Sequence, residues 1–256
     1  MSADSPELIR FVDLYKSFGE NRVFSGLNLS VRRGETLTVI GGSGAGKSVL
    51  LKTLIGLERP DAGRVYFEGA DVTRMAEREL REVRRKVAMV FQGAALFDSM
   101  TVLDNVAYPL RVRFPRMAEE EIRARSRSKL ALVSLSGAGH LLPSSLSGGM
   151  RKRVGLARAI ATEPEVILWD EPTTGLDPIS RRTINTLIVS MQKKLEVTSI
   201  VVTHDMTSAF AVSDRIAMLA DRRIVEVGAP DELKGSRLSM VREFLDARAL
   251  EEVSGQ

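Results

Sequence analysis

The chain has 256 residues, of which 44% are apolar and 27% are charged, as in folded globular proteins and unlike disordered ones. Lysine and arginine exceed aspartate and glutamate by 37 − 33 = 4, an excess too small to indicate a nucleic-acid-binding protein. The lack of cysteine excludes disulfides, thiolate metal sites and a cysteine nucleophile. No apolar run approaches the ~18 residues that span a bilayer, and no secretory signal pattern opens the chain, so we expect a cytoplasmic protein.

Short apolar runs alternate with segments of helical composition along most of the chain. The sequence predicts strands at 35–40, 64–68, 86–91, 166–170 and 198–203, helices at 46–57 and 184–195, and a closing hairpin at 215–219 and 223–227. The runs at 166–170 and 198–203 show no alternation, which is typical of strands covered on both faces. This order of strands and helices predicts a mostly parallel sheet flanked by helices.

Two parts of the chain depart from this alternation. Residues 8–14 and 23–31 alternate in a way that favours antiparallel strands. From position 93 to about position 160 the patterns are helical, and Pro109, Pro115 and Pro143 divide them. We therefore expect a single α/β domain. Its parts are a core with an antiparallel β subdomain (1–92 and 161–228), an inserted helical subdomain (93–160) and a helical tail (229–256).

A glycine-rich segment between the first core strand and its helix predicts a phosphate-binding loop. Gly41-Gly-Ser-Gly-Ala-Gly-Lys-Ser48 fits the pattern G-x-x-x-x-G-K-[ST]. Glycines let successive backbone N–H groups curl around a phosphate, and the helix N-terminus adds its positive end. The Lys47 ammonium suits the β- and γ-phosphates, and the Ser48 hydroxyl suits Mg²⁺. The sequence thus predicts a nucleotide-binding site.

Polar side chains follow three of the predicted strands at their carboxyl ends. Asp170, at the end of one strand, suits Mg²⁺, and the adjacent Glu171 suits a general base for the attacking water. His204 follows the next strand, and because parallel strand ends meet at one edge of the sheet, we expect it near the γ-phosphate. Gln92 follows a third strand and is either a contact of Mg²⁺ or the attacking water, or a solvated strand end.

A second helix N-terminus suits an anion. Ser147 is a favoured N-cap residue, and Gly148 and Gly149 expose the first backbone N–H groups of the helical run that follows. A capped surface helix is the alternative. A second anion site is explained if two chains meet around a nucleotide, each offering this helix to the γ-phosphate of the other.

In this order and over nearly the whole chain, these motifs resemble those of the ATPase subunit of ATP-binding cassette (ABC) transporters. The corresponding family motifs are Walker A (41–48), the Q-loop (Gln92), the signature (146–150), Walker B (166–170 with Glu171), the D-loop (175–177) and the switch histidine (His204). The resemblance implies a P-loop NTPase (RecA-like) fold that hydrolyses ATP with Mg²⁺. It also implies a head-to-tail homodimer with two ATP molecules between the chains.

The same resemblance assigns the site residues. Those expected to contact ATP are Phe18, which would stack on adenine, and Gly41, Gly42, Ser43, Gly44, Ala45, Gly46, Lys47, Ser48, Val49, Ser147, Gly148, Gly149 and Asp177. Those expected to be catalytic are Glu171, His204 and Gln92, and those expected at the metal are Ser48, Gln92 and Asp170.

Finer similarities point to one subgroup of the family. Residues 46–52, 91–97 and 104–111 resemble the Mla/Mce-type lipid-transport ATPases, as does Met150, where glutamine is more usual. That group pairs the ATPase with a multi-pass permease and an MCE-domain lipid-binding protein. The resemblance implies phospholipid transport between envelope membranes and a place on the cytoplasmic face of the inner membrane.

The apolar segment after Gln92 is the part of the chain where we expect a permease of that subgroup to dock. Its residues are Ala94, Ala95, Leu96, Phe97, Met100, Val102 and Leu103. An exposed subset would form a groove for a permease helix. The alternative is that all of them belong to the core of the helical subdomain.

Other functions remain to be compared with this one. The ATPase of a polar amino-acid or other small-solute importer shares every catalytic residue, so it stays open as the alternative. A soluble ABC ATPase of DNA repair or translation would carry long coiled-coil insertions or two cassettes, and this chain has one phosphate loop and no sustained heptads. A kinase or GTPase would not explain the signature segment or His204. We expect no nucleic-acid partner.

Overall fold

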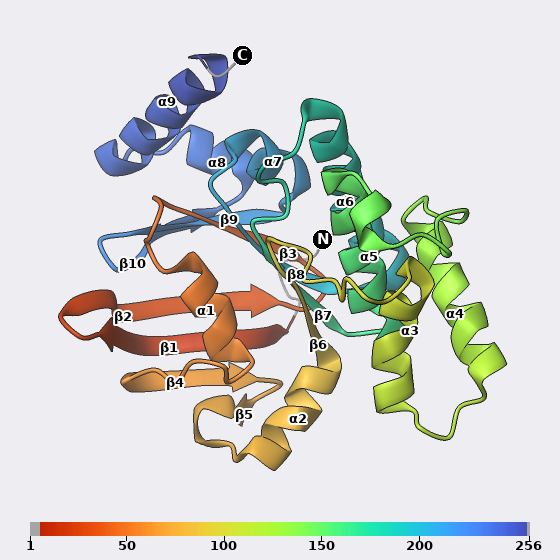
Figure 1. Ribbon diagram of the computed structural model, residues 1–256. Helices are drawn as coiled ribbons and strands as arrows, with labels where there is room; N and C mark the ends of the chain where they lie inside the picture. Colours follow the sequence, from red (N-terminus) through yellow and green to blue (C-terminus); the bar gives the residue numbers. More distant parts are fainter. Residues whose placement is uncertain (1–5, 255–256) are drawn as a thin grey trace.

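The computed structural model describes residues 6–254, with side chains placed for residues 6–247, and contains two sheets and a group of helices (Figure 1). The larger sheet has the strand order β10-β9-β3-β8-β7-β6. Its strands are β3 (Thr36–Ile40), β6 (Val87–Val90), β7 (Val166–Asp170), β8 (Thr198–Thr203), β9 (Arg215–Ala220) and β10 (Arg223–Gly228). All neighbours pair in parallel except the hairpin of β9 and β10. This confirms the predicted mostly parallel core and its closing hairpin.

The smaller sheet is antiparallel, as the alternating pattern near the N-terminus predicts. Its order is β2-β1-β4-β5, with β1 (Glu7–Phe18), β2 (Asn21–Arg32), β4 (Ala62–Phe67) and β5 (Ala70–Asp71). Ile9 and Phe11 of β1 are buried while Arg10 between them is exposed. The apolar face of this sheet therefore points inward, toward the larger sheet.

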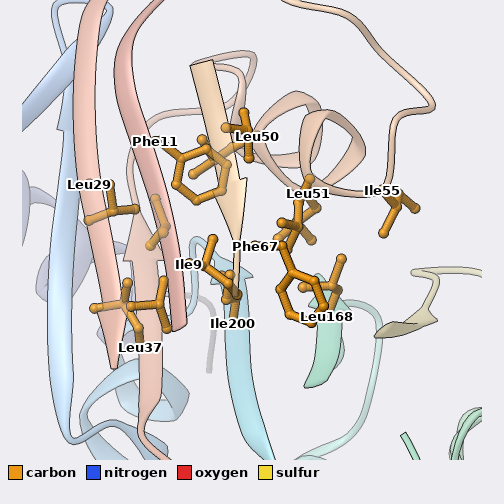
Figure 2. Packing of buried hydrophobic residues seen from close by; sticks show 14 of the residues in the cluster. Ile9, Phe11, Leu29, Leu37, Leu50, Leu51, Ile55, Phe67, Leu168 and Ile200 are labelled. Atoms are coloured by element: carbon orange, nitrogen blue, oxygen red, sulfur yellow. The ribbon is translucent and has the colours of Figure 1, made fainter. Parts of the chain in front are cut away.

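Helix α1 (Lys47–Leu54), which follows the phosphate loop, packs against both sheets. Leu50, Leu51 and Leu54 are fully buried in a cluster with residues of β1, β2, β3, β4, β7 and β8. Figure 2 shows Leu50 and Leu51 of this helix beside Phe11 and Phe67 of the smaller sheet. Because α1 is enclosed in this way, the loop at its N-terminus has a rigid base.

The central strands are covered on both faces, as their unbroken apolar runs predict. On β7, Leu168 belongs to the cluster that surrounds α1, while Ile167 and Trp169 belong to a second cluster with the helices on the other face. These helices are α3 (Val102–Arg113), α4 (Glu119–Leu132), α5 (Gly148–Ala159) and α6 (Pro178–Leu195). In the described structure, residues 93–160 contain helices and turns and no strand.

One sequence expectation about helices needs correction, and one helix was not predicted at all. Pro109 does not divide two helices but lies inside α3, where buried Val106 and Leu110 on either side keep the helix packed on its core. Helix α2 (Glu77–Lys86) was not predicted, because eight of its ten residues are charged and only Leu80 and Val83 are buried. The structure also contains three short 3₁₀ turns, at Val72–Arg74, Pro143–Ser145 and Ile160–Thr162.

The described part of the expected tail, residues 229–254, contains α8 (Pro230–Lys234) and α9 (Ser239–Ser254), while α7 (Met206–Val212) lies earlier, between β8 and β9. Leu233 and Val241 pack with Met218 of β9 in a third buried cluster, so the start of the tail belongs to the fold of its own chain. Within residues 6–254, no helix combines the length and apolar character needed to cross a membrane.

Candidate nucleotide-binding site

The phosphate loop joins β3 to α1, and two of its glycines, Gly41 and Gly46, are required by close approaches to neighbouring atoms. A Cβ on Gly41 would overlap the carbonyl oxygen of Leu219, and a Cβ on Gly46 would overlap the side chain of Val23. Gly44 and Gly46 also have φ values of 76° and 101°, in the left-handed region that favours glycine. The loop therefore leaves the sheet edge in a tight turn that ends at the N-terminus of α1, an arrangement suited to phosphate.

Lys47 and Ser48 begin α1 and turn toward the acidic end of β7. The Lys47 ammonium donates to the carbonyl oxygens of Gly41 and Gly42 at 2.9 and 3.1 Å and lies 3.8 Å from Oε1 of Glu171. The Ser48 hydroxyl donates to Oδ1 of Asp170 at 2.6 Å. The loop and the carboxyl end of β7, 122 residues apart in sequence, thus share one site.

Glu171 lies at the centre of a polar cluster. Its Oε2 is 2.9 Å from Nδ1 of His204 and accepts hydrogen bonds from the hydroxyls of Thr174 and Thr203 at 3.0 and 3.2 Å. The Glu171 backbone has φ 48° and donates its N–H to the carbonyl of Val202. A non-glycine residue in this region is strained, by about 1–3 kcal/mol, and strain of this kind is common at functional sites.

The oxygen pair of Ser48 and Asp170 fits Mg²⁺. This ion prefers oxygen ligands, and proteins usually hold it through one or two carboxylates, waters and the substrate's phosphates. Within residues 6–254 there is no group of three or more His, Cys, Asp or Glu side chains that would cage a metal. A site with few protein ligands beside a phosphate loop suits a metal that arrives with its nucleotide.

Two further residues from the sequence analysis lie at exposed positions. Phe18 ends β1 with 45% of its surface exposed, and the Lys16 ammonium is 4.7 Å from the centre of its ring. Gln92 follows β6 at the same sheet edge as Asp170 and is also exposed. The exposed Phe18 ring is available for stacking on a base.

Ser147 and Asp177 both act as helix caps in this structure. The Ser147 hydroxyl accepts the Met150 N–H at the start of α5, and Asp177 accepts the N–H groups of Ile179 and Ser180 at the start of α6. Hydrogen bonds from Ser180 lower the pKa of the Asp177 carboxyl. A Cβ on Gly149 would lie 2.7 Å from the Ser180 hydroxyl, so the close packing of α5 on α6 also requires glycine there.

A groove of about 1170 Å³ extends from His204 along α6 and α7. Basic side chains, Arg181, Arg182, Lys193 and Lys194, contribute to its lining. The Arg181 guanidinium lies 3.3 Å from the Asp205 carboxylate at its inner end. The positive field of these side chains adjoins the His204 side of the cluster.

Sequence reasoning missed four residues that shape the site. Thr174 and Thr203 donate to the Glu171 carboxylate, Lys152 donates to backbone carbonyls of the loop that follows β7, and fully buried Asn105 bonds to the backbone of residues 97–101. Thr203 directly precedes His204, and that adjacency was the signal that could have found it. Asn105 lies within residues 104–111, but the resemblance there assigned it no role, and Thr174 and Lys152 carry no motif.

The fold and the site define a P-loop NTPase, with a phosphate loop beside a Ser48–Asp170 oxygen pair suited to Mg²⁺. The family model described as "ABC transporter" matches residues 24–174, and the chain belongs to this family. The match includes the phosphate loop, the signature segment and Glu171. The match confirms the resemblance to this family, and together with the solved structure described below it supports the fold class, ATP as the nucleotide and ATP hydrolysis as the activity.

Similar proteins of this family are named for different transported substances. Over 224 residues the chain is 44% identical to the methionine import ATP-binding protein MetN of Mesorhizobium japonicum, covering 88% of this chain and 61% of MetN. Over 238 residues it is 41% identical to the intermembrane phospholipid transport system ATP-binding protein MlaF of Haemophilus influenzae, covering 93% of this chain and 90% of MlaF. The chain thus spans about three fifths of the MetN relative. These matches do not single out the Mla/Mce subgroup.

A solved structure agrees with the architecture. The dimeric structure of a post-hydrolysis state of the ATP-binding cassette MJ0796, bound to ADP and Pi, superposes with a TM-score of 0.79 at 32% identity. The match covers 87% of this chain and 98% of that one. The mixed α/β cassette fold expected from the sequence is thereby confirmed.

Proposed function

We propose that the chain is the energy-coupling ATPase of an ABC transporter that moves phospholipid or another hydrophobic substrate across or between envelope membranes. It works with a multi-pass permease and an MCE-domain protein, as a peripheral subunit on the cytoplasmic face of the inner membrane. Support comes from the MlaF relative and from the resemblance at residues 46–52, 91–97 and 104–111.

In this proposal each polar group of the site has one role. Lys47 and the loop N–H groups bind the β- and γ-phosphates, and Ser48 and Asp170 hold Mg²⁺, with Gln92 completing the metal site. Bound Mg²⁺ would neutralise phosphate charge. Glu171 accepts a proton from the attacking water as general base, and His204, held 2.9 Å from its carboxylate, contacts the γ-phosphate.

The proposed active form is a head-to-tail homodimer. Ser147, Gly148 and Gly149 stand at the N-terminus of α5, whose amide groups and dipole favour an anion. Within one chain Lys47, Asp170 and Glu171 already form a cluster, so this second anion site is available for the γ-phosphate held by another copy. The MJ0796 structure is dimeric, which supports a dimer as the active form.

An exposed aromatic pair carries the proposal of a membrane partner. Phe97 and Tyr108 are 41% and 40% exposed with ring centroids 4.9 Å apart, and Val112 on the same helix as Tyr108 is 66% exposed. Asn105 fixes this surface by bonding to the N–H and the carbonyl of Phe97. Exposed apolar side chains of this kind suit docking of another protein's helix.

The remainder of that segment divides between core and surface. Ala94 and Val102 are buried, Leu96, Met100 and Leu103 are partly buried, and Ala95 is exposed beside Phe97. Only part of the segment is therefore available to a permease helix. A small-solute importer ATPase remains the second candidate, because the MetN relative, which is 44% identical, is named for methionine import.

The test is mass spectrometry of proteins and lipids that copurify with the tagged full-length chain from detergent-solubilised native membranes. We expect a multi-pass permease, an MCE-domain protein and phospholipid. Phe97→Asp should lose the permease while its ATPase activity persists, because a charge on the docking surface opposes burial. Leu57→Asp, at a leucine elsewhere on the surface that is 53% exposed, is the control and should retain the permease.

Other outcomes would redirect the proposal. A permease with a small-solute-binding protein would favour the second candidate. Recovery of soluble partners alone, under conditions that keep membrane complexes intact, would overturn the transporter proposal.

A further inference from the structure

Lys152 is a cation that the mechanism has not used. It lies on α5, five residues after the cap Ser147, and its ammonium reaches across to the segment that follows β7. There it donates to the carbonyl oxygens of Thr174 at 2.7 Å, Pro172 at 2.9 Å and, more weakly, Glu171 at 3.4 Å. A lysine ammonium has three donors, and here three backbone carbonyls from one short turn converge on it.

This environment is unusual for a lysine. Burial lowers the pKa of Lys152, while the nearby negative charge of Glu171 acts in the opposite direction. The three acceptors are carbonyl dipoles rather than carboxylates. A half-buried ammonium held by carbonyl oxygens is desolvated without a full counter-charge, a cost that its three hydrogen bonds to the turn offset.

The turn that Lys152 binds is the one that shapes the catalytic cluster. Glu171 is the first residue of this turn and has a left-handed backbone conformation. The Thr174 N–H donates to the Glu171 carbonyl oxygen at 3.4 Å. The Thr174 hydroxyl donates to the Glu171 carboxylate at 3.0 Å. A strained turn of this kind persists only when its surroundings hold it, and Lys152 supplies contacts at three of its carbonyls.

We propose that Lys152 is a positioning residue for ATP hydrolysis. Its ammonium keeps residues 171–174 in the conformation that presents the Glu171 carboxylate beside Lys47 and His204. Because Lys152 stands on the helix that begins at Ser147, it also ties that helix N-terminus to the catalytic turn of the same chain. The inference rests on the proposed role of Glu171 as general base.

The experiment compares Lys152→Met with Lys129→Met in the full-length chain. Lys129 is a matched control because it is also a lysine on a neighbouring helix with a mostly buried side chain, but it pairs with Glu163 at 2.9 Å, away from the cluster. We expect Lys152→Met to lower kcat on the order of tenfold to hundredfold with KM for ATP within about twofold, because the general base is misplaced while phosphate binding is intact. Lys129→Met should keep kcat.

A second readout separates positioning from simple loss of stability. Hydrogen exchange of the amides of residues 171–176 should become faster in Lys152→Met than in Lys129→Met, measured where both variants are folded. Lys152→Arg, which keeps a cation and N–H donors, should recover more of kcat than Lys152→Gln, and both serve if the methionine variant does not fold. Unchanged kcat and unchanged exchange in all Lys152 variants would overturn the inference.

Glu171→Gln, assayed in parallel, distinguishes this inference from its premise. An inactive Glu171→Gln together with fully active Lys152 variants would remove the positioning role and leave the general base in place. A fully active Glu171→Gln would remove the general base, and the positioning role would be lost with it.

Discussion

At the scale of single residues, the site depends on how one carboxylate is oriented. Oε2 of Glu171 receives hydrogen bonds from Thr174 on its own turn and Thr203 at the end of β8, and Nδ1 of His204 contacts the same oxygen, while Oε1 faces Lys47. The sequence predicts separate roles for the adjacent carboxylates Asp170 and Glu171, and in the structure the two side chains point to different partners. Asp170 accepts from the Ser48 hydroxyl, while Glu171 turns into the cluster with His204.

Glu171→Gln should abolish most ATP turnover, by about 10²–10⁴-fold, because the amide cannot accept the proton of the attacking water. ATP binding should persist, since the phosphate loop is unchanged, and an ATP-bound dimer should accumulate. Turnover by phosphate release, nucleotide affinity and size-exclusion chromatography check these outcomes. Glu163→Gln is the control, because Glu163 also has a left-handed backbone but pairs with Lys129. Normal turnover in Glu171→Gln would remove this residue from the mechanism.

At the scale of elements, side-chain hydrogen bonds mark where α3 and α5 begin. The sequence indicated Ser147 as the cap of α5 but gave no boundary for α3. Helix α3 begins after Thr101, whose hydroxyl accepts the Asp104 N–H at 3.1 Å and donates to the Asp104 carboxylate at 2.6 Å. Pro109 falls in the third turn of that helix and does not end it, because its neighbours are buried. Tertiary packing outweighed the local signal.

Asp104→Asn should lower the free energy of unfolding at pH 7 by about 0.5–1 kcal/mol, because the carboxylate lies in the first turn of α3 and also pairs with Arg111. Hydrogen bonds from Thr101 and Arg111 lower the pKa of Asp104. A lowered carboxyl pKa stabilises the fold above the unfolded-state value of about 3.9, and this contribution is lost as the pH falls through the folded-state pKa. The difference between wild type and variant should therefore shrink below about pH 4.

Thermal and denaturant unfolding from pH 7 to pH 3 measures this difference. Asp98→Asn, an exposed aspartate just before α3, is the matched control and should change stability little at any pH. A stability difference for Asp104→Asn that stays constant with pH would contradict the electrostatic explanation.

At the scale of the whole molecule, the two proposed anion sites belong to elements packed on opposite faces of one sheet. One face packs on α1 and carries the phosphate loop, and the other packs on the helices that include α5, at whose N-terminus Ser147 lies (Figure 1). The proposed head-to-tail dimer would bring the first site of one copy to the second site of another.

Mixing two inactive variants tests that geometry. Lys47→Ala removes the phosphate-binding ammonium, and Ser147→Arg blocks the N-terminus of α5. Neither homodimer should therefore contain a working site. A heterodimer keeps one intact site, and equal mixing should restore roughly a quarter of wild-type ATPase activity. Phosphate release measures the recovery.

The control mixture combines Ser147→Arg chains with chains that carry both substitutions. No intact site can form in that mixture, so its activity should stay at background. Absence of recovery in the first mixture, with heterodimers shown by differently tagged copies, would count against a shared site.

The amino-acid sequence by itself determined the strands of the core, the phosphate loop, the acidic strand end and the family. These features depend on local order: an unbroken apolar run indicates a doubly covered strand, and a phosphate loop needs its glycines, lysine and serine at fixed spacing. Tertiary structure alone decided that Thr203 and Thr174 orient Glu171, that Lys152 binds the catalytic turn, and which of residues 94–103 are exposed. These contacts join residues that are distant in sequence, and the exposure of residues 94–103 depends on how the segment packs. No local sequence pattern encodes such contacts or such exposure.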